Sequence, residues 1–217
     1  PAACAAFRIA PIIAVVVRAL PHIDVGHSPA FMRRRLANWL PLGLTYALLY
    51  MGRYNLTVSK NFLPENMMTK EDFATIFFWG TLTYGVSFVI NGPLADRIGG
   101  RATILITAAG SAVMNAALGL VIFSGYTGNL VVIFSVIYAL NMYFQSFGAV
   151  SIVKVNAAWF HIRERGAFGG IFGILISLGI FLALDVGRMI AEAAPTHWLF
   201  STPALLLTLF FGISFLF

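Results

Sequence analysis

Residues 73–123 read FATIFFWGTLTYGVSFVINGPLADRIGGRATILITAAGSAVMNAALGLVIF. Two apolar runs, 73–95 and 102–123, are joined here by a short charged stretch that contains two adjacent glycines. A helix needs about 20 mostly apolar residues to cross roughly 30 Å of hydrocarbon, and each run has that length. The stretch therefore predicts two membrane-spanning helices joined by a tight turn.

The same pattern extends over most of the chain. The composition is 59% hydrophobic and only 10% charged, which is more apolar surface than a water-soluble domain of 217 residues could bury. Strands of an outer-membrane barrel would alternate in polarity, whereas these runs are continuously apolar. We therefore predict an all-α membrane protein with six spans, at residues 36–58, 73–95, 102–123, 130–155, 166–186 and 198–217.

The two ends of the chain differ from its middle. Residues 1–31 hold an interrupted apolar run, and Met32 followed by three arginines resembles a natural start, so we interpret 1–31 as a leader of doubtful status. The last apolar run continues to Phe217 without a basic linker. We therefore expect residues 32–217 to form the N-terminal half of a longer membrane protein whose C-terminal half is missing here.

Basic residues fall at the ends of alternate spans. The net charge of +6 arises at helix ends and short loops rather than on one basic face, so no nucleic-acid partner is expected. Because cytoplasmic loops of membrane proteins are enriched in Lys and Arg, the pattern predicts a cytoplasmic amino terminus. The residues on that side are Arg33, Arg34, Arg35, Arg97, Arg101, Arg163 and Arg165.

The loop between the second and third runs is the most specific motif, Gly92-Pro-Leu94-Ala-Asp96-Arg97-Ile-Gly99-Gly-Arg101. Gly99 and Gly100 permit the positive φ of a tight turn, and Arg97 and Arg101 suit an anionic interface. A carboxylate at Asp96 is expected to pair with an arginine or to cap a neighbouring helix. The resemblance of this loop to the signature motif of a transporter family implies that it is a gate, and the alternative is a charged turn between two apolar helices.

A polar face is predicted on the first span. Tyr46, Tyr50 and Arg53 are spaced i, i+4 and i+7 and therefore share one side of the helix. Arg53 lies about 14 residues past Trp39, roughly 21 Å into the hydrocarbon, where a guanidinium is costly and generally functional. Its planar fork suits a phosphate or carboxylate. The alternative is a structural arginine that pairs with a carboxylate or a carbonyl elsewhere in the bundle.

The fourth span supplies further candidates. Asn141 and Gln145 are four residues apart and are expected to face the bundle interior. Lys154 could attract the substrate as a second cation or extend to the lipid headgroups. Near the opposite surface, Asp185 and Arg188 are predicted to form a local ion pair. No metal-ligand spacing, nucleophile with a base, or phosphate-cradling loop is present, so neither an enzyme nor a cofactor is expected.

The loop motif resembles the G-x-L-a-D-r-x-G-r-k pattern of the major facilitator superfamily. The first span, Tyr46-Ala-Leu-Leu-Tyr50-Met-Gly-Arg53-Tyr-Asn55, is similar to the first helix of the organophosphate:phosphate antiporters, which carry glycerol 3-phosphate or hexose phosphates. Three further segments share this likeness, which covers about 32–186: Tyr84-Gly85, Phe144-Gln145, and Trp159-Phe160 with Glu164-Arg165-Gly166.

The resemblance implies a twelve-helix fold whose halves are each a 3+3 inverted repeat. It also implies that Arg53 is one of two arginines that hold the phosphate, and that Tyr46, Tyr50 and Tyr84 line the cavity. The chain departs from carriers of glycerol 3-phosphate where they have a second-helix lysine, a fifth-helix histidine and Trp-Pro-Pro, because these positions are Phe88, Ile176 and Ala149-Val150-Ser151 here. The substrate identity therefore stays open.

We expect a secondary active transporter of the inner membrane that exchanges a small anionic organophosphate for phosphate by alternating access. Its partners would be that substrate, the lipid bilayer and its own C-terminal half. Rival interpretations are a proton-coupled carboxylate symporter, a drug exporter, or a non-transporting membrane receptor with the same fold. A membrane-embedded enzyme has the least support, because no catalytic cluster is found in the sequence.

Overall fold

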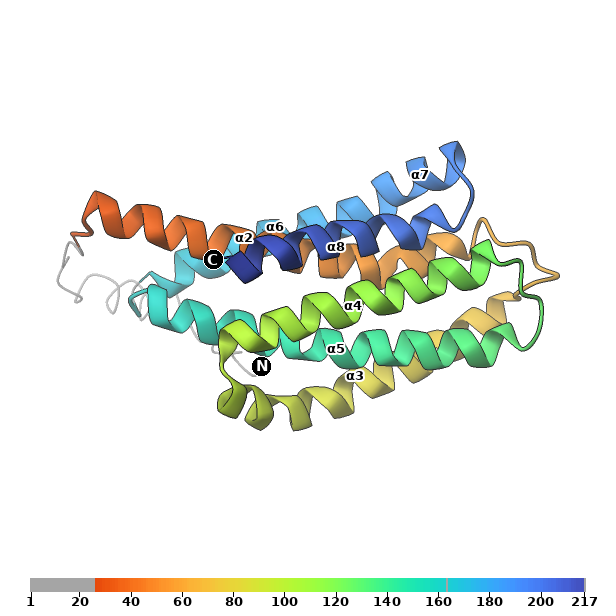
Figure 1. The fold of residues 1–217 in the computed structure, drawn as a ribbon, viewed down its shortest axis with the longest axis horizontal. Coiled ribbons are helices and arrows are strands. Elements are labelled where there is room, and N and C mark those ends of the chain that lie inside the picture. The colour runs from red at the N-terminus through yellow and green to blue at the C-terminus, as the bar shows by residue number, and fades with distance from the viewer. Residues whose placement is uncertain (1–25, 163, 217) are drawn as a thin grey trace, which may run out of the picture. The chain divides into compact units, whose positions relative to one another are not determined.

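The computed structural model describes residues 26–162 and 164–216, and every regular element within them is helical. The chain divides into two compact units, Pro1–Arg34 and Arg35–Phe217. The elements, shown in Figure 1, are α2 (Pro29–Ser59), α3 (Lys70–Ile98), α4 (Gly100–Phe123), α5 (Leu130–Trp159), α6 (Arg165–Phe181), the π-helix η1 (Leu182–Val186), α7 (Gly187–Ala193) and α8 (Trp198–Leu216). Most of the predicted leader, residues 1–25, lies outside the described residues.

Five helical segments among the described residues are long and apolar enough to cross a membrane. They are Lys70–Ile98, Gly100–Phe123, Leu130–Asn156, Phe168–Ala193 and Trp198–Leu216. Five of the six predicted spans coincide with them. The first predicted span, 36–58, is helical within α2 but is not among the five, because Arg53 and other polar residues lower its mean hydropathy. The sixth crossing and the 3+3 repeat therefore stay predictions.

The start and the end of α3 follow from local sequence. At its start the Asp72 amide donates to Thr69 Oγ1 at 3.2 Å, and the Thr69 amide donates to Asp72 Oδ2 at 2.8 Å, which is a capping box. At its end Gly99 has φ 94°, a conformation that only glycine adopts without strain. Gly100 is needed for a different reason, because a Cβ there would lie 2.6 Å from Val155 Cγ2 of α5.

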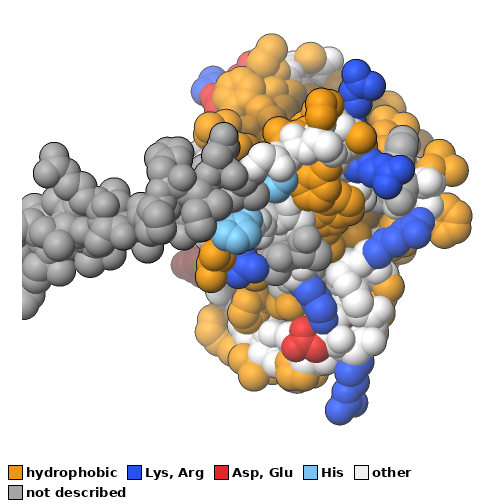
Figure 2. All heavy atoms as spheres, turned by 90° about the vertical axis from the view of Figure 1, so that its left-hand side faces the viewer, with side chains coloured by type: hydrophobic (Ala, Val, Ile, Leu, Met, Phe, Trp, Pro, Cys, Tyr) orange, Lys and Arg blue, Asp and Glu red, His pale blue; other side chains and the backbone are white. Residues whose placement is uncertain are grey.

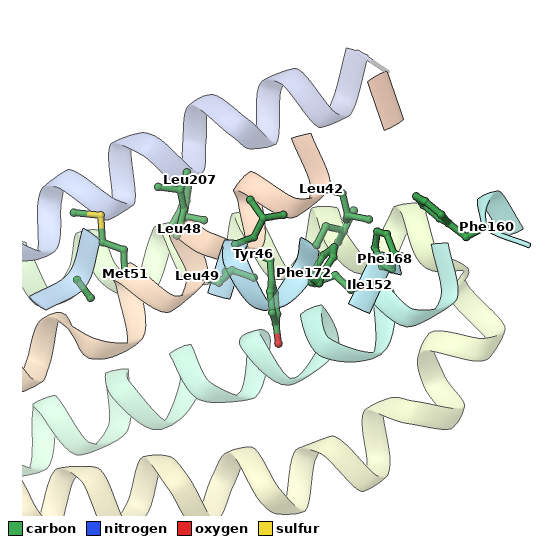
Figure 3. Packing of buried hydrophobic residues seen from close by; sticks show 14 residues of the cluster. Leu42, Tyr46, Leu48, Leu49, Met51, Ile152, Phe160, Phe168, Phe172 and Leu207 are labelled. Carbon is green, nitrogen blue, oxygen red and sulfur yellow. The ribbon is translucent and has the colours of Figure 1, made fainter. Parts of the chain in front are cut away.

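Helix α5 holds a central position in the second unit. It packs against α3 and α4, and α4 in turn packs against α8 (Figure 1). Apolar side chains of α2, α6 and α8 form one of two core clusters. In Figure 3, Leu48 of α2 and Leu207 of α8 point toward each other, while Tyr46 points away from α8. One side of α2 thus packs on α8, and the side that carries Tyr46 packs on α6, where the ring centroids of Tyr46 and Phe172 are 5.7 Å apart.

The distribution of polarity is the reverse of that in a water-soluble bundle. Large apolar side chains such as Val89 and Leu120 are 73% and 63% exposed, whereas Asn115 and Asn141 are fully buried. This arrangement is stable when lipid covers the outside, because apolar surface costs nothing there and polar side chains must find partners within the bundle. The chain is therefore an integral membrane protein.

One end of the bundle is basic. The turn between α3 and α4 and the turn between α5 and α6 lie at this end, where Lys and Arg side chains gather (Figure 2). Arg97, Arg101, Lys154 and Arg165 belong to these segments, and the predicted Arg163 lies outside the described residues. Near the opposite end, an ion pair between Arg188 and Asp185 was predicted, and this prediction is wrong. Arg188 Nε donates to Glu192 Oε1 at 2.8 Å, one turn further along α7.

Candidate functional site

Aromatic rings and one guanidinium meet between α2 and α3. Tyr46 and Tyr50 contact each other with ring centroids 5.2 Å apart, and Arg53 Cζ lies 5.1 Å from the Tyr50 centroid. Tyr84 of α3 approaches the same guanidinium, with its centroid 4.6 Å from Arg53 Cζ. The structure thus brings together four of the residues that the sequence singles out. Two rings stabilise the cation by cation–π attraction while leaving it half-buried.

The partner of Arg53 is neutral. Its Nε donates to Gln145 Oε1 of α5 at 2.9 Å. Within the described residues this is the only side-chain hydrogen bond of the guanidinium, and none of the ion pairs found there involves Arg53. A guanidinium has five N–H donors. Arg53 therefore has capacity left for an acceptor that the described chain does not supply.

Asn141 and Gln145 lie directly behind this arginine. Both are fully buried, and Gln145 Nε2 donates to Asn141 Oδ1 at 3.2 Å. Asn141 Nδ2 donates to the carbonyl of Gly52 at 3.1 Å, and Tyr138 Oη donates to the carbonyl of Arg53 at 3.2 Å. Side chains of α5 thus bind the two consecutive backbone carbonyls of α2 that flank the Cα of Arg53. These bonds fix the depth and rotation of Arg53 relative to α5.

Three residues of this network escape the sequence analysis. Ser111 Oγ donates to Asn141 Oδ1 at 2.7 Å, and Asn115 Oδ1 accepts from Asn55 Nδ2 at 2.8 Å. All three of these residues, Ser111, Asn115 and Asn55, are buried. The available signal was the i, i+4 spacing of Ser111 and Asn115 on an otherwise apolar helix, which is typical of a polar contact between membrane helices.

Close helix approach makes this network possible. A Cβ at Gly52 would lie 2.8 Å from Asn115 Nδ2, so any larger side chain would push α2 and α4 apart. Asn115 Nδ2 also donates to the Ser111 carbonyl at 2.9 Å. Gly52, next to Arg53, thus lets the Asn115 side chain of α4 lie directly against α2.

Lys154 is not brought to Arg53. Its Nζ lies 2.8 Å from Asp96 Oδ1 and donates to the Ala95 carbonyl at 3.1 Å, at the basic end of the bundle. The sequence predicted that Asp96 pairs with an arginine or caps a neighbouring helix, and the structure pairs it with this lysine instead. A lysine on α5 reaches the end of α3 because these two helices are packed together. Lys154 and the loop motif therefore belong to one site, and Arg53 to another.

The other residues of the loop motif have different surroundings. Gly92 is free of close neighbours on the side where a Cβ would project, whereas Gly99 is required for the turn itself. Arg97 is exposed at the end of α3. Arg101 Nη2 donates to the Phe215 carbonyl at 2.8 Å and so connects α4 to α8. A second contact at this end joins Arg35 Nη1 to Glu164 Oε2 at 3.0 Å.

The side chains around Arg53 do not include a set of metal ligands. No three His, Cys, Asp or Glu side chains within residues 26–162 and 164–216 gather closely enough to hold a metal ion. The interior cation has phenol rings beside it and a neutral amide behind it. A guanidinium in that setting can accept a phosphate or carboxylate by charge-assisted hydrogen bonds.

These features define an all-helical membrane protein with a half-buried arginine inside its helix bundle. The family model described as Major Facilitator Superfamily matches residues 42–217, and the chain belongs to this family. Membership of this family points to a transporter rather than an enzyme.

Three curated proteins are similar in sequence to this chain. The chain is 27% identical over 180 residues to a glycerol-3-phosphate transporter of Bacillus subtilis, which covers 76% of this chain and 40% of the relative. It is 29% identical over 153 residues to the membrane sensor protein UhpC of Salmonella typhimurium, covering 69% of this chain and 32% of the relative. It is 28% identical over 145 residues to UhpC of Escherichia coli, covering 64% and 30%. The chain thus spans about a third of the length of these relatives.

Proposed function

We propose that the protein is a secondary active transporter that exchanges an organophosphate for inorganic phosphate by alternating access. The observation that carries this proposal is the state of Arg53, which is half-buried in a membrane bundle, bound by a neutral amide at 2.9 Å, and without a carboxylate partner among the described residues. An interior cation with no counter-charge is costly unless a ligand supplies one.

The tyrosines shape the ligand side of this site. Tyr50 and Tyr84 lie against the guanidinium, and Phe88 stacks on Tyr84 with centroids 6.2 Å apart. Phe88 is apolar and cannot bind an oxyanion, so this part of the chain contacts the phosphate mainly through Arg53 and phenol hydroxyls. In the proposed mechanism a second half of the protein supplies the remaining contacts, and the empty carrier does not reorient.

The orientation in the membrane is part of the same proposal. The basic end of the bundle, with Arg97, Arg101 and Arg165, would face the cytoplasm of a bacterial cell, and the amino terminus would lie on that side. The pair of Lys154 and Asp96 would then lie at the cytoplasmic mouth of the carrier, where the loop motif is proposed to act as a gate.

The test is exchange of radiolabelled phosphate in proteoliposomes that contain the full-length protein. We expect exchange in the wild type and loss of at least about 90% of it in Arg53→Lys, because a lysine cannot form two parallel hydrogen bonds with a phosphate. Arg188→Lys is the matched control, since Arg188 is an exposed arginine already paired with Glu192. Exchange that is unaffected by Arg53→Lys would remove Arg53 from the site.

A second candidate function is sensing, because two of the relatives are named membrane sensor proteins. A sensor built on the same site would bind an organophosphate without transporting it. The two functions separate when binding and exchange are measured on the same preparation. Binding that depends on Arg53, with no exchange across the bilayer, would favour the sensor.

A further inference from the structure

Asn141 and Gln145 are candidate ligands for the substrate from sequence, yet both side chains are 0% exposed in the structure. A side chain with no accessible surface reaches a ligand only through another residue. For Gln145 that residue is Arg53, whose Nε donates to Gln145 Oε1 at 2.9 Å. Whether Gln145 can accept this hydrogen bond depends on which end of its amide faces Arg53.

Two acceptors hold the other end of the Gln145 amide. Its Nε2 donates to Ser111 Oγ and to Asn141 Oδ1, each at 3.2 Å. If the amide were flipped, Nε2 would face the Nε–H of Arg53, donor against donor, and Oε1 would face Asn141 Oδ1, acceptor against acceptor. Buried polar groups left unsatisfied in this way are strongly disfavoured. The amide therefore has one orientation, with its oxygen toward the guanidinium.

The orientation of Asn141 is decided in the same manner. Its Oδ1 accepts from Ser111 Oγ at 2.7 Å and from Asn115 Nδ2 at 3.4 Å, while its Nδ2 donates to the Gly52 carbonyl. The chain of constraint thus runs from α4 through α5 to the arginine of α2. Every member of it is neutral, so it directs the guanidinium without cancelling its charge.

We infer that Gln145 is a positioning residue which, oriented by Ser111 and Asn141, holds Arg53 by its Nε and leaves the Nη1 and Nη2 groups for an anion. This inference deepens the proposed function and rests on it. It assigns Ser111 and Asn141 to phosphate recognition although neither touches the ligand. It also explains why the residue behind the arginine is an amide, because a carboxylate there would occupy the guanidinium as an internal anion.

The test measures the affinity of the purified full-length protein for radiolabelled inorganic phosphate, together with its thermal unfolding midpoint in detergent. Gln145→Glu conserves the size of the side chain and adds a counter-charge. We expect it to weaken phosphate binding about tenfold or more with the protein still folded. Ser111→Ala removes one acceptor from Gln145 Nε2 and is expected to weaken binding about three- to tenfold.

The chain offers a matched control for the loss of a buried serine. Ser146 is also 0% exposed, and its Oγ accepts from Asn91 Nδ2 at 2.7 Å between α5 and α3, but neither residue touches Arg53. Ser146→Ala should lower the unfolding midpoint about as much as Ser111→Ala while changing phosphate affinity less than about twofold. A purely structural role for Ser111 would make the two variants equal in both measurements.

A double-mutant cycle completes the test. If Ser111 acts through Gln145, then Ser111→Ala should weaken binding in the wild type and add nothing in a Gln145→Leu background. Equal losses in both backgrounds, or a Gln145→Glu protein that binds phosphate normally, would overturn the positioning role while leaving the transporter proposal intact. A wild-type protein that binds no phosphate at all would overturn both.

Discussion

The interior and the basic end of this bundle treat their cations differently. At the basic end Arg35 lies 3.0 Å from Glu164 and Lys154 lies 2.8 Å from Asp96, so these two cations each have a carboxylate partner. In the interior Arg53 is bound by a neutral amide and two phenol rings. The side chains of Lys154 and Asp96 are 34% and 71% exposed, so the loss of one partner would cost little there, whereas an unmatched charge inside the bundle is expensive.

The contrast teaches where to look for a ligand. Surface ion pairs are worth about 0–1 kcal/mol and mainly restrain the turns that they join. An interior cation that keeps only neutral partners is stabilised enough to be tolerated and still attracts an anion. We therefore expect substitutions inside the bundle to change phosphate binding and protein stability strongly. Substitutions at the ends should change the rate of exchange modestly or have no effect.

The largest effect is expected for Arg53→Leu. This change removes the only interior cation that the described residues place beside Tyr50 and Tyr84. Phosphate binding should weaken at least about 100-fold, since a bidentate charge-assisted contact contributes about 3 kcal/mol or more. Equilibrium binding of radiolabelled phosphate measures the loss. A decrease in phosphate affinity of less than threefold would contradict the proposal that Arg53 attracts the anion.

The next effect concerns the stability of the interior. Asn115→Leu leaves Asn55 Nδ2 without its partner at 2.8 Å and brings a branched side chain against Gly52. We expect the free energy of unfolding to fall by about 1–3 kcal/mol, which is measured as a lower unfolding midpoint in detergent. Ser135→Ala is the control, because the buried Ser135 hydroxyl has no hydrogen-bond partner among the described residues. Its removal should leave the midpoint unchanged or raise it slightly.

A smaller effect is expected at Lys154. If this residue contacts the substrate, Lys154→Gln should weaken phosphate binding. Because its Nζ lies 2.8 Å from Asp96, we expect instead a change of a few-fold in the rate of exchange, with phosphate affinity altered less than about twofold. Asp96→Asn should have the same effect, and the double variant should add nothing. Weakened binding in Lys154→Gln alone would place the lysine at the substrate site.

The smallest effect is expected for Arg188→Gln. This arginine and its partner Glu192 are 69% and 51% exposed in their side chains and lie away from both sites. Neither phosphate exchange nor the unfolding midpoint should change measurably, and added salt should make no difference. A clear loss of exchange would show that charge at this end of the bundle also matters, which would weaken the comparison between interior and surface.

The parts of the site that could be predicted from sequence are those that depend on one helix. Tyr46, Tyr50 and Arg53 share a face because of helical spacing alone, and the structure places their side chains in succession. The capping box at Thr69 and the positive φ of Gly99 are equally local. The contact with Tyr84 was expected only through resemblance, because no periodicity relates α2 to α3.

The parts that escaped depend on how helices are rotated against one another. Ser111 and Asn115 are unremarkable polar residues on an apolar helix until α4 is placed beside α2 and α5. Lys154 was a candidate for the substrate site until the packing of α3 on α5 gave it Asp96. Rotations of this kind follow from side-chain packing over whole helix surfaces.

By itself the sequence determined that this protein lies in a membrane as a bundle of helices, and it predicted that one helix carries an arginine on a polar face with two tyrosines. Length and hydropathy suffice for that, since lipid allows so few backbone structures. Only the tertiary structure decided that, among the described residues, Arg35, Lys154 and Arg188 pair with carboxylates whereas Arg53 is bound by a neutral amide. Hydrogen bonds and ion pairs act over about 3 Å, and partners distant in the chain, such as Arg53 and Gln145, are brought that close only by helix packing.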